Sequence, residues 1–304
     1  MKKNILIIGG TGFFGYHLSK FFLKFKWNVF SLSKSAPNNL RKLKSIRYLH
    51  GDISKAKSIQ FLKDFNFNYI INCGGYVDHV NKIRTFNTHF IGCKNLYKIF
   101  ANKKIETFIQ IGSSAEYGKS KSPLKETYPG KAKTIYGKSK LRASKFLLSL
   151  KNRNFPFVII RPFLLYGPFQ DSNRFLPFVI SSFIANKKFV CSDCTQYRDF
   201  LHIADAVRAI KACLGNKKVF RKIVNIGLGK PIQLRKAISI IQKKIKKGKP
   251  DFGKLALRSD EPEVIFPEIK RAKKYLNWRP AISFEQGIIR TINYFKKNSH
   301  IAKI

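Results

Sequence analysis

The stretch Ile5-Leu6-Ile7-Ile8-Gly9-Gly10-Thr11-Gly12-Phe13-Phe14-Gly15 stands near the start of the chain and decides its fold. Four aliphatic residues without a charge are typical of a strand that is buried on both faces, as in a parallel sheet. Three glycines follow at regular spacing, and after them come apolar residues at helical intervals: Phe14, Leu18, Phe21, Phe22 and Phe25. The pattern predicts a strand, a glycine turn and an amphipathic helix.

A glycine turn of this kind can hold a diphosphate. Gly9 permits a backbone conformation that a Cβ would disfavour, Gly12 lets a phosphate approach the main chain, and Gly15 lets the helix pack closely on the strand. The helix N-terminus adds free N–H groups and a partial positive charge. The alternatives are a purely structural turn and a secretory signal, but the glycines interrupt the apolar run too early for a signal. We expect a dinucleotide, NAD or NADP, to contact Gly9, Thr11, Gly12, Phe13, Phe14 and Gly15.

The composition limits the class of protein. At 304 residues the chain is long enough for one large α/β domain with a smaller lobe. No stretch approaches the ~20 uncharged apolar residues of a membrane span, so we expect no membrane partner. Five cysteines form no disulfide framework in a chain of this size, and a cytoplasmic location is expected. Cys191 and Cys194 lack a second pair of ligands, so we expect no metal site.

The net charge of +44 has two interpretations. A nucleic acid, an anionic membrane or a phosphorylated substrate would be attracted to such a chain. Alternatively, the charge reflects a biased composition, because the basic residues are spread along the whole sequence. We favour the second interpretation.

The second predicted strand, residues 28–32, ends at Ser33-Lys34-Ser35. In a dinucleotide-binding sheet, an acidic residue commonly stands there and binds the ribose 2′-hydroxyl of NAD. A lysine between two hydroxyls suits a 2′-phosphate instead. We therefore expect Ser33 and Lys34 at the cofactor, and favour NADP over NAD.

Three more strands are predicted at residues 46–53, 69–75 and 107–114, separated by helical segments. This alternation is typical of a doubly wound parallel sheet, in which ligands bind beyond the carboxyl ends of the strands. Asp52 could accept a hydrogen bond from adenine, or could cap a helix. The residues that we expect at the cofactor here are Asp52, Ile53, Cys73, Gly74 and Gly75.

A tyrosine and a lysine open a predicted helix in the segment Tyr136-Gly-Lys-Ser-Lys140. Residues i and i+4 share a helix face. A phenol with an ordinary pKa of about 10 works as a base near neutral pH only where cations favour the phenolate, and Lys140 and an oxidised nicotinamide ring are both cationic. Ser113 could hydrogen-bond the same substrate oxygen. We predict Ser113, Tyr136 and Lys140 as catalytic residues, with Tyr136 and Lys140 also at the cofactor.

Together these motifs resemble the extended short-chain dehydrogenase/reductases, in the NAD-dependent epimerase/dehydratase family that acts on nucleotide sugars. The resemblance runs over most of the chain. It rests on the glycine turn, on Tyr136 with Lys140, and on the segments Ser113-Ser114-Ala115-Glu116-Tyr117-Gly118, Arg161-Pro162-Phe163-Leu164-Leu165-Tyr166-Gly167-Pro168, Tyr197-Arg198-Asp199-Phe200-Leu201-His202 and Leu276-Asn277-Trp278-Arg279-Pro280. It implies that Tyr136 is the base, that Lys140 holds the ribose, and that Ser113 completes the triad.

The resemblance also implies a set of substrate contacts. Arg198 matches an arginine that clamps the nucleotide diphosphate, although an ion pair with Asp199 or Asp205 is the alternative. The implied substrate-binding residues are Ser114, Arg174, Arg198 and Arg258. Family members often dimerise through helices that include the one carrying Tyr136, so we expect a homodimer.

Two positions depart from the family pattern. Family dehydratases carry acidic residues directly after the triad Ser or Thr, whereas this chain has Ser114 and Ala115. Glu116 stands one position later, and we expect it to face elsewhere. Elimination of water is therefore disfavoured. His89 stands where an asparagine is frequent, which puts one contact of the active-site helix in doubt.

We expect an α/β fold with a Rossmann doubly wound parallel sheet in residues 1–165, resumed around 198–227, and a smaller C-terminal substrate-binding lobe in 166–197 and 228–304. The expected function is hydride transfer at a carbon of a nucleotide-diphosphate sugar, C4 by family analogy, as an NAD(P)-dependent epimerase. An NADPH-dependent 4-keto-6-deoxysugar reductase is one alternative. A nucleic-acid-binding protein on a Rossmann scaffold is the alternative from another class, which an intact triad disfavours.

Overall fold

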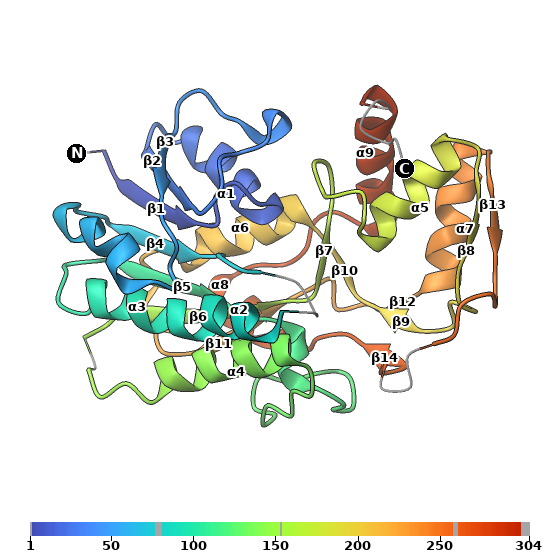
Figure 1. The fold of residues 1–304 in the computed structure, drawn as a ribbon. Coiled ribbons are helices and arrows are strands. Elements are labelled where there is room, and N and C mark those ends of the chain that lie inside the picture. Colours follow the sequence, from blue (N-terminus) through green and yellow to red (C-terminus); the bar gives the residue numbers. More distant parts are fainter. Residues whose placement is uncertain (1, 77–80, 153, 258–260, 299–304) are drawn as a thin grey trace.

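A seven-stranded parallel sheet forms the centre of the computed structural model, which describes residues 2–76, 81–152, 154–257 and 261–298 (Figure 1). All neighbouring strands in the sheet pair in parallel. In spatial order the strands are β11 (Ile223–Ile226), β6 (Phe157–Pro162), β5 (Thr107–Ile111), β4 (Tyr69–Asn72), β1 (Asn4–Ile8), β2 (Asn28–Ser33) and β3 (Arg47–His50). The order reverses between β1 and β4, as in a doubly wound sheet. The predicted Rossmann fold class is confirmed.

Helices cover both faces of the sheet because β1 is apolar on both sides. Ile5 and Ile7 belong to the apolar cluster on one face, and Leu6 and Ile8 belong to the cluster on the other. The first cluster includes residues of α1 (Phe13–Leu23), α6 (Ile203–Cys213) and α8 (Lys270–Leu276). The second includes residues of α3 (Gly92–Phe100), α4 (Ile135–Leu148) and the 3-10 segment η2 (Ala56–Asp64).

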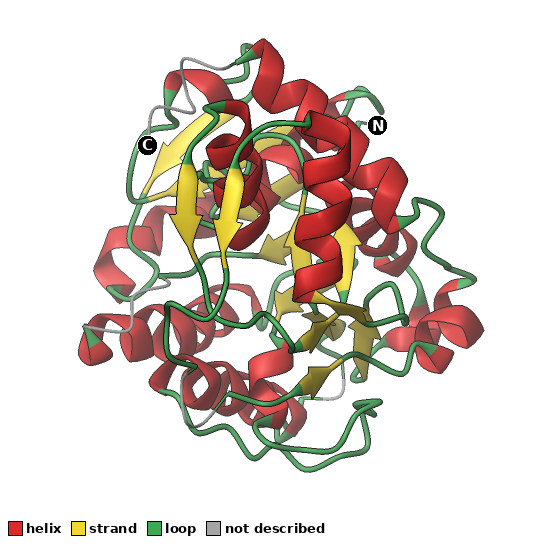
Figure 2. Cartoon of the chain, turned by 90° about the vertical axis from the view of Figure 1, so that its right-hand side faces the viewer, coloured by secondary structure: helices red, strands yellow, loops and turns green. Residues whose placement is uncertain are grey.

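A second, smaller group of elements has its own apolar core (Figures 1 and 2). Helices α5 (Phe175–Ile184), α7 (Leu234–Ile245) and α9 (Phe284–Lys297) pack around it. Three small sheets accompany them: β7 (Leu164–Tyr166) with β10 (Phe200–His202), β8 (Lys188–Val190) with β13 (Lys249–Asp251), and β9 (Tyr197–Arg198) between β12 (Ile232–Gln233) and β14 (Val264–Ile265). Although α8 lies in the range expected for the lobe, it packs on the central sheet.

The remaining elements are short and connect the larger ones. They are η1 (Asn39–Arg41), α2 (Lys82–Phe86), a π-helical turn η3 (Asn87–Ile91), η4 (Ser114–Tyr117) and η5 (Lys217–Val219).

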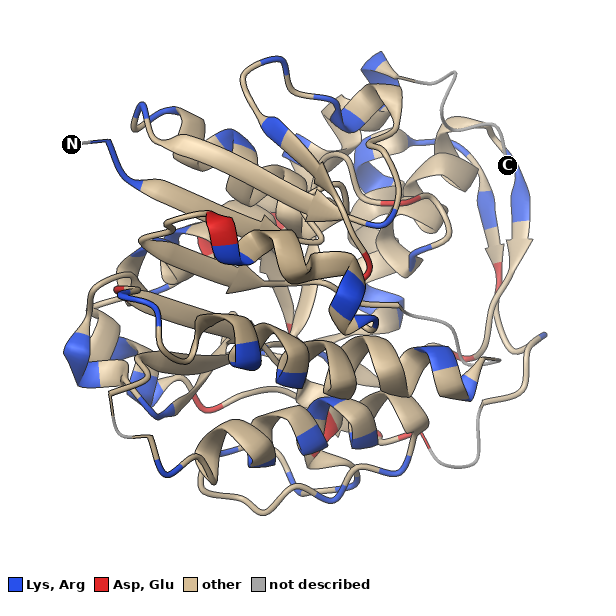
Figure 3. Ribbon diagram, turned by 60° about the vertical axis from the view of Figure 1, so that its left-hand side comes forward, with Lys and Arg blue, Asp and Glu red and all other residues tan. Residues whose placement is uncertain are grey.

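Basic side chains are dispersed over the helices and loops rather than gathered on one element (Figure 3). Among the described residues, no helix has the length and apolarity needed to cross a membrane.

A buried aspartate joins α6 to the segment that leads into α9. Asp205 is fully buried, and its Oδ2 accepts the N–H groups of Ala281 and Ile282 at 3.0 and 2.9 Å. The indole Nε1 of Trp278 donates to the Asp205 carbonyl oxygen at 3.1 Å. The carboxylate and the main-chain carbonyl of Asp205 therefore anchor the segment between α8 and α9 to α6.

The substitution Asp205→Asn tests this anchor. An amide cannot accept both N–H groups and pair with Arg208 as well, so we expect the free energy of unfolding to fall by about 1–3 kcal/mol. Asp193→Asn removes the same charge from an exposed side chain and serves as the matched control in denaturant titrations. Equal stability of the two variants would contradict the anchoring role.

Candidate functional site

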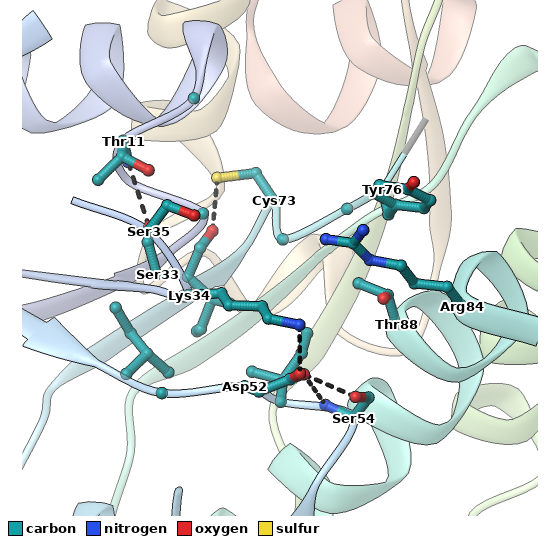
Figure 4. Close-up of a pocket in the computed structure, with 18 residues that line it drawn as sticks. Thr11, Ser33, Lys34, Ser35, Asp52, Ser54, Cys73, Tyr76, Arg84 and Thr88 are labelled. Carbon is teal, nitrogen blue, oxygen red and sulfur yellow. Dashed lines mark hydrogen bonds and ion pairs between the residues drawn. The ribbon is translucent and has the colours of Figure 1, made fainter. Parts of the chain in front are cut away.

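The site lies at the carboxyl edge of the sheet, where the strand order reverses (Figure 4). A cavity of about 270 Å³ opens there, and the ends of four strands line it. Its lining includes the predicted cofactor residues Gly9, Thr11, Gly12, Ser33, Lys34, Asp52, Ile53, Cys73, Gly74 and Gly75. Residues far apart in the sequence thus share one cavity, as expected from the parallel order of the strands.

The glycine turn has no room for side chains. Gly9 adopts φ +75°, and a Cβ there would lie 2.9 Å from the carbonyl oxygen of Cys73. A Cβ on Gly15 would lie 2.2 Å from the carbonyl oxygen of Gly9, so only glycine allows α1 to start this close to the turn. Gly12 is the N-cap of α1 and contributes no side-chain acceptor to the first helical turn. The first N–H groups of α1 are consequently suited to bind an anion.

Thr11, Phe13 and Phe14, which were also predicted at the cofactor, have different surroundings. The Thr11 N–H group donates to Ser33 Oγ at 3.4 Å, which ties the turn to the end of β2. The side chains of Phe13 and Phe14 pack against the core beneath the sheet. Both side chains are half-buried, and neither residue is part of the cavity lining.

Lys34 and Asp52 form an ion pair across the cavity floor, with 3.3 Å between Nζ and Oδ2 (Figure 4). Asp52 also accepts hydrogen bonds from the Ser54 N–H and Oγ, at 3.0 and 2.6 Å. Burial alone would raise the pKa of Asp52, but the bonds from Ser54 and the Lys34 ammonium outweigh it and hold the pKa below its usual value. The carboxylate therefore caps a local turn and is available as an acceptor at this end of the cavity.

Several residues of the lining were not predicted from the sequence, among them Arg84 and Tyr76. Arg84 and Tyr76 line the cavity, and the Arg84 guanidinium lies 3.8 Å from the centre of the Tyr76 ring. No motif or periodicity marks Arg84, because α2 is only one turn long and is set by tertiary packing. Arg84 adds a second cation to a cavity that already holds Lys34.

The three predicted catalytic residues lie at η4 and on α4, the elements beside the end of β5, and none of them is part of the cavity lining described above. Ser113 follows this strand and caps η4, with its Oγ accepting the Ala115 N–H at 3.1 Å. Lys140 is buried, and its Nζ donates to the Ile111 carbonyl oxygen at 2.7 Å. The same Nζ lies 5.9 Å from the centre of the Tyr136 ring. A Cβ on Gly137 would lie 2.6 Å from the Ala115 carbonyl oxygen, so the start of α4 presses directly on η4.

His89 connects the cavity wall to Tyr136. Its ring contacts the Tyr136 ring edge-to-face at 5.1 Å, and a Cβ on Gly75 would lie 2.7 Å from His89 Cε1. Burial and the Lys140 ammonium lower the pKa of His89 well below its usual value, so the ring is neutral. Nε2 lies 3.2 Å from the Tyr76 carbonyl oxygen and must carry the hydrogen, because a carbonyl only accepts. Within the described chain, Nδ1 has no partner.

The predicted substrate residues lie in different environments. The Arg198 guanidinium is buried and donates to Glu261 Oε1 at 2.5 Å and to the Tyr197 and Glu263 carbonyl oxygens. Neither alternative partner takes this place, because Asp199 accepts backbone N–H groups and Asp205 pairs with Arg208. These three acceptors hold the Arg198 guanidinium in place.

Two other predicted substrate residues can be located. Arg174 is exposed and is the N-cap of α5. Ser114 lines a second cavity, of about 200 Å³, together with Lys119 and Lys133. Arg258 lies outside the described residues.

Glu116 lines neither of these two cavities. It is fully buried and pairs with Arg161 at 2.6 Å. The expectation that it faces elsewhere is confirmed.

A family model described as the NAD dependent epimerase/dehydratase family matches residues 5–227. The chain belongs to this family. The resemblance found from the motifs is therefore confirmed, and the family to which the chain belongs is NAD-dependent by its description.

Curated relatives match the chain over almost its full length. An uncharacterized UDP-glucose epimerase, YtcB, of Bacillus subtilis is 28% identical, with 95% of this chain and 97% of the relative covered. A UDP-glucuronate 4-epimerase of Thermodesulfobacterium geofontis is 26% identical, with 98% of each chain covered. A human dTDP-D-glucose 4,6-dehydratase is also 26% identical, covering 98% of this chain and 91% of the relative.

Solved structures support the fold. The epimerase Mth375 of Methanothermobacter thermautotrophicus superposes with a TM-score of 0.92 at 21% identity, covering 99% of this chain and 94% of that one. A UDP-glucuronic acid 4-epimerase from Bacillus cereus, solved with UDP-glucuronic acid and NAD, gives 0.88 at 24% identity, covering 97% of this chain and 99% of that one.

Cys73 provides a test of the environment at the end of β4. Its thiol donates to the Ile8 carbonyl oxygen at 2.9 Å, and burial raises its pKa to about 12. Because only the thiolate reacts, roughly one molecule in 10⁴ is reactive at pH 8, and we expect iodoacetamide to modify folded Cys73 slowly although it lines the cavity. Mass spectrometry of the folded chain, with the urea-unfolded chain as control, measures this. Rapid labelling of folded Cys73 would show that the thiol is ionised.

Proposed function

We propose that the chain is an NAD(P)-dependent nucleotide-sugar epimerase that acts at C4 of the sugar, with Ser113, Tyr136 and Lys140 as its catalytic residues. The observation that carries the proposal is the Lys140–Ile111 hydrogen bond of 2.7 Å, which holds the lysine and tyrosine of α4 at the strand end that bears Ser113. The two epimerase relatives, which act on UDP sugars by their names, support the substrate class.

The cavity has features that suit the diphosphate of a dinucleotide. A Cβ at Gly9 would contact backbone, the first turn of α1 begins at Gly12, and Lys34 and Arg84 add positive charge. A bound nicotinamide supplies a hydride acceptor and donor. Tyr136 takes the proton of the sugar hydroxyl and later returns it, and the buried Lys140 lies beside its ring on the same helix. Ser113 hydrogen-bonds the same oxygen and orients it.

Two alternatives differ in what happens to the sugar. A dehydratase needs acidic residues after the triad serine, where this chain has Ser114 and Ala115, and Glu116 is paired with Arg161 in the core. Relatives of the epimerase and of the dehydratase kind both match the chain, so this choice rests on these positions. A 4-keto-sugar reductase using NADPH is the second candidate, and Lys34 between two serines of the cavity lining favours it.

A panel of nucleotide sugars tests the function. The panel consists of UDP-glucose, UDP-glucuronic acid, dTDP-glucose and a dTDP-4-keto-6-deoxy sugar, each incubated with and without added NADPH. A C4 epimer formed without net NADPH consumption is the expected result, and stoichiometric consumption of NADPH supports the reductase. Tyr136→Phe should lower kcat by about 10²-fold or more while dinucleotide affinity stays within about twofold. Full activity of Tyr136→Phe would refute the mechanism.

For the cofactor, we propose that Lys34 binds the 2′-phosphate of NADP, so that NADP binds more tightly than NAD. In Lys34→Gln we expect NADP affinity to fall about tenfold, because a charge-assisted hydrogen bond is lost, and NAD affinity to stay unchanged. Titration of both dinucleotides, with Lys243→Gln as matched control because Lys243 is exposed on α7 and outside the cavity lining, measures the difference. If both dinucleotides lose affinity equally in Lys34→Gln, the lysine does not discriminate between them.

A further inference from the structure

Glu116 is a buried carboxylate without a role in the chemistry proposed above. Its Oε1 accepts the backbone N–H of Ser113 at 2.9 Å in a capping box. A Cβ on Gly112 would lie 2.4 Å from the same oxygen, so the chain leaves room for the carboxylate only because that position is glycine. One oxygen of Glu116 thus fixes the main chain at the serine of the triad.

The second oxygen of Glu116 reaches the helix that carries the other two triad residues. Oε2 accepts the hydroxyl of Ser144 at 2.7 Å. Ser144 lies four residues after Lys140 and eight after Tyr136, so all three share one face of α4. A single carboxylate therefore connects the turn of Ser113 to the helix face of Tyr136 and Lys140.

Arg161 on β6 keeps this carboxylate in place. Its Nη2 donates to Glu116 Oε2 at 2.6 Å, and its guanidinium lies 4.5 Å from the centre of the Tyr117 ring. The side chains of both ion-pair partners are at most 2% exposed, so water cannot replace either of them. A buried pair of this kind is rigid, because separating its members leaves an uncompensated charge.

We propose that Glu116 is a positioning residue that holds Ser113 in register with Tyr136 and Lys140 through Ser144. This inference rests on the proposed function of the triad. The Lys140–Ile111 bond also ties α4 to the end of β5, and it lies one helical turn before Ser144. Loss of the Ser144 bond therefore weakens the polar connection between α4 and the turn of Ser113. A shift of about 1 Å in a catalytic group can cost 10²-fold in rate.

Ser144→Ala is the sharpest variant, because it cuts the tie to α4 and leaves the Glu116–Arg161 pair intact. Ser139→Ala is the matched control: Ser139 is equally buried on the same helix, but its hydroxyl bonds only the Ile135 carbonyl oxygen within the helix. Ser144→Thr keeps the hydroxyl and should rescue the loss. Glu116→Gln removes the charge of the carboxylate. If Glu116→Gln does not fold, Ser144→Ala alone tests the proposal.

Amide hydrogen exchange without any ligand tests the geometry. We expect Ser144→Ala to exchange about five to ten times faster than Ser139→Ala in residues 112–118 and 134–140, because one buried hydrogen bond is lost. With the panel sugar that the unmodified chain converts fastest, kcat should fall about tenfold or more while KM stays within about twofold. A merely structural role would not lower kcat selectively in this way.

The outcomes separate the two proposals. Unchanged exchange in Ser144→Ala overturns the positioning role whatever the substrate is. Faster exchange in Ser144→Ala together with the kcat and KM of the Ser139→Ala control shows that Glu116 is only structural, which also overturns it. An inactive Tyr136→Phe together with a fully active Ser144→Ala overturns positioning alone, whereas an active Tyr136→Phe overturns the proposed function and the positioning role with it.

Discussion

The parallel pairing of β1 with β4 is the constraint on which the site depends. This pairing brings Ile8 beside Asn72, so the glycine turn after β1 and the small residues after β4 leave the sheet at the same edge. Because the strand order reverses between these strands, the connections diverge and leave a cavity. The Gly9 turn lies so close to the Cys73 carbonyl oxygen that only glycine fits at position 9. The proposed triad depends on the same edge, since β5 pairs with β4 and Ser113 follows β5 there.

The positions of individual charged residues say more about this structure than the net charge does. The excess of basic residues is dispersed over many elements (Figure 3), whereas several of the acidic residues join one element to another. Asp205 anchors the segment before α9, Asp52 caps the turn at the cavity, and Glu116 joins the end of β5 to α4. In a chain with only 16 acidic residues, those that are buried carry out structural tasks that a hydroxyl or amide could not.

The central sheet and most of the cavity could be predicted from the sequence, because long apolar runs and a glycine turn are local signals. In a parallel sheet the carboxyl ends of all strands lie at one edge. The predicted strands alone therefore place Ser33, Asp52 and Gly74 near one another. The small strands of the C-terminal part, two or three residues long, have no periodicity to detect. Arg84 and the partners of Arg198 and Glu116 were not predictable, because each depends on side-chain packing between segments far apart in the chain.

A crystal structure of the chain grown with saturating NADP or NAD tests the central claim most directly. We expect the diphosphate within hydrogen-bond distance of the main-chain N–H groups that follow Gly12, and the nicotinamide ring beside Tyr136 and Lys140. A dinucleotide bound elsewhere on the chain, or a nicotinamide ring remote from Tyr136, would contradict it.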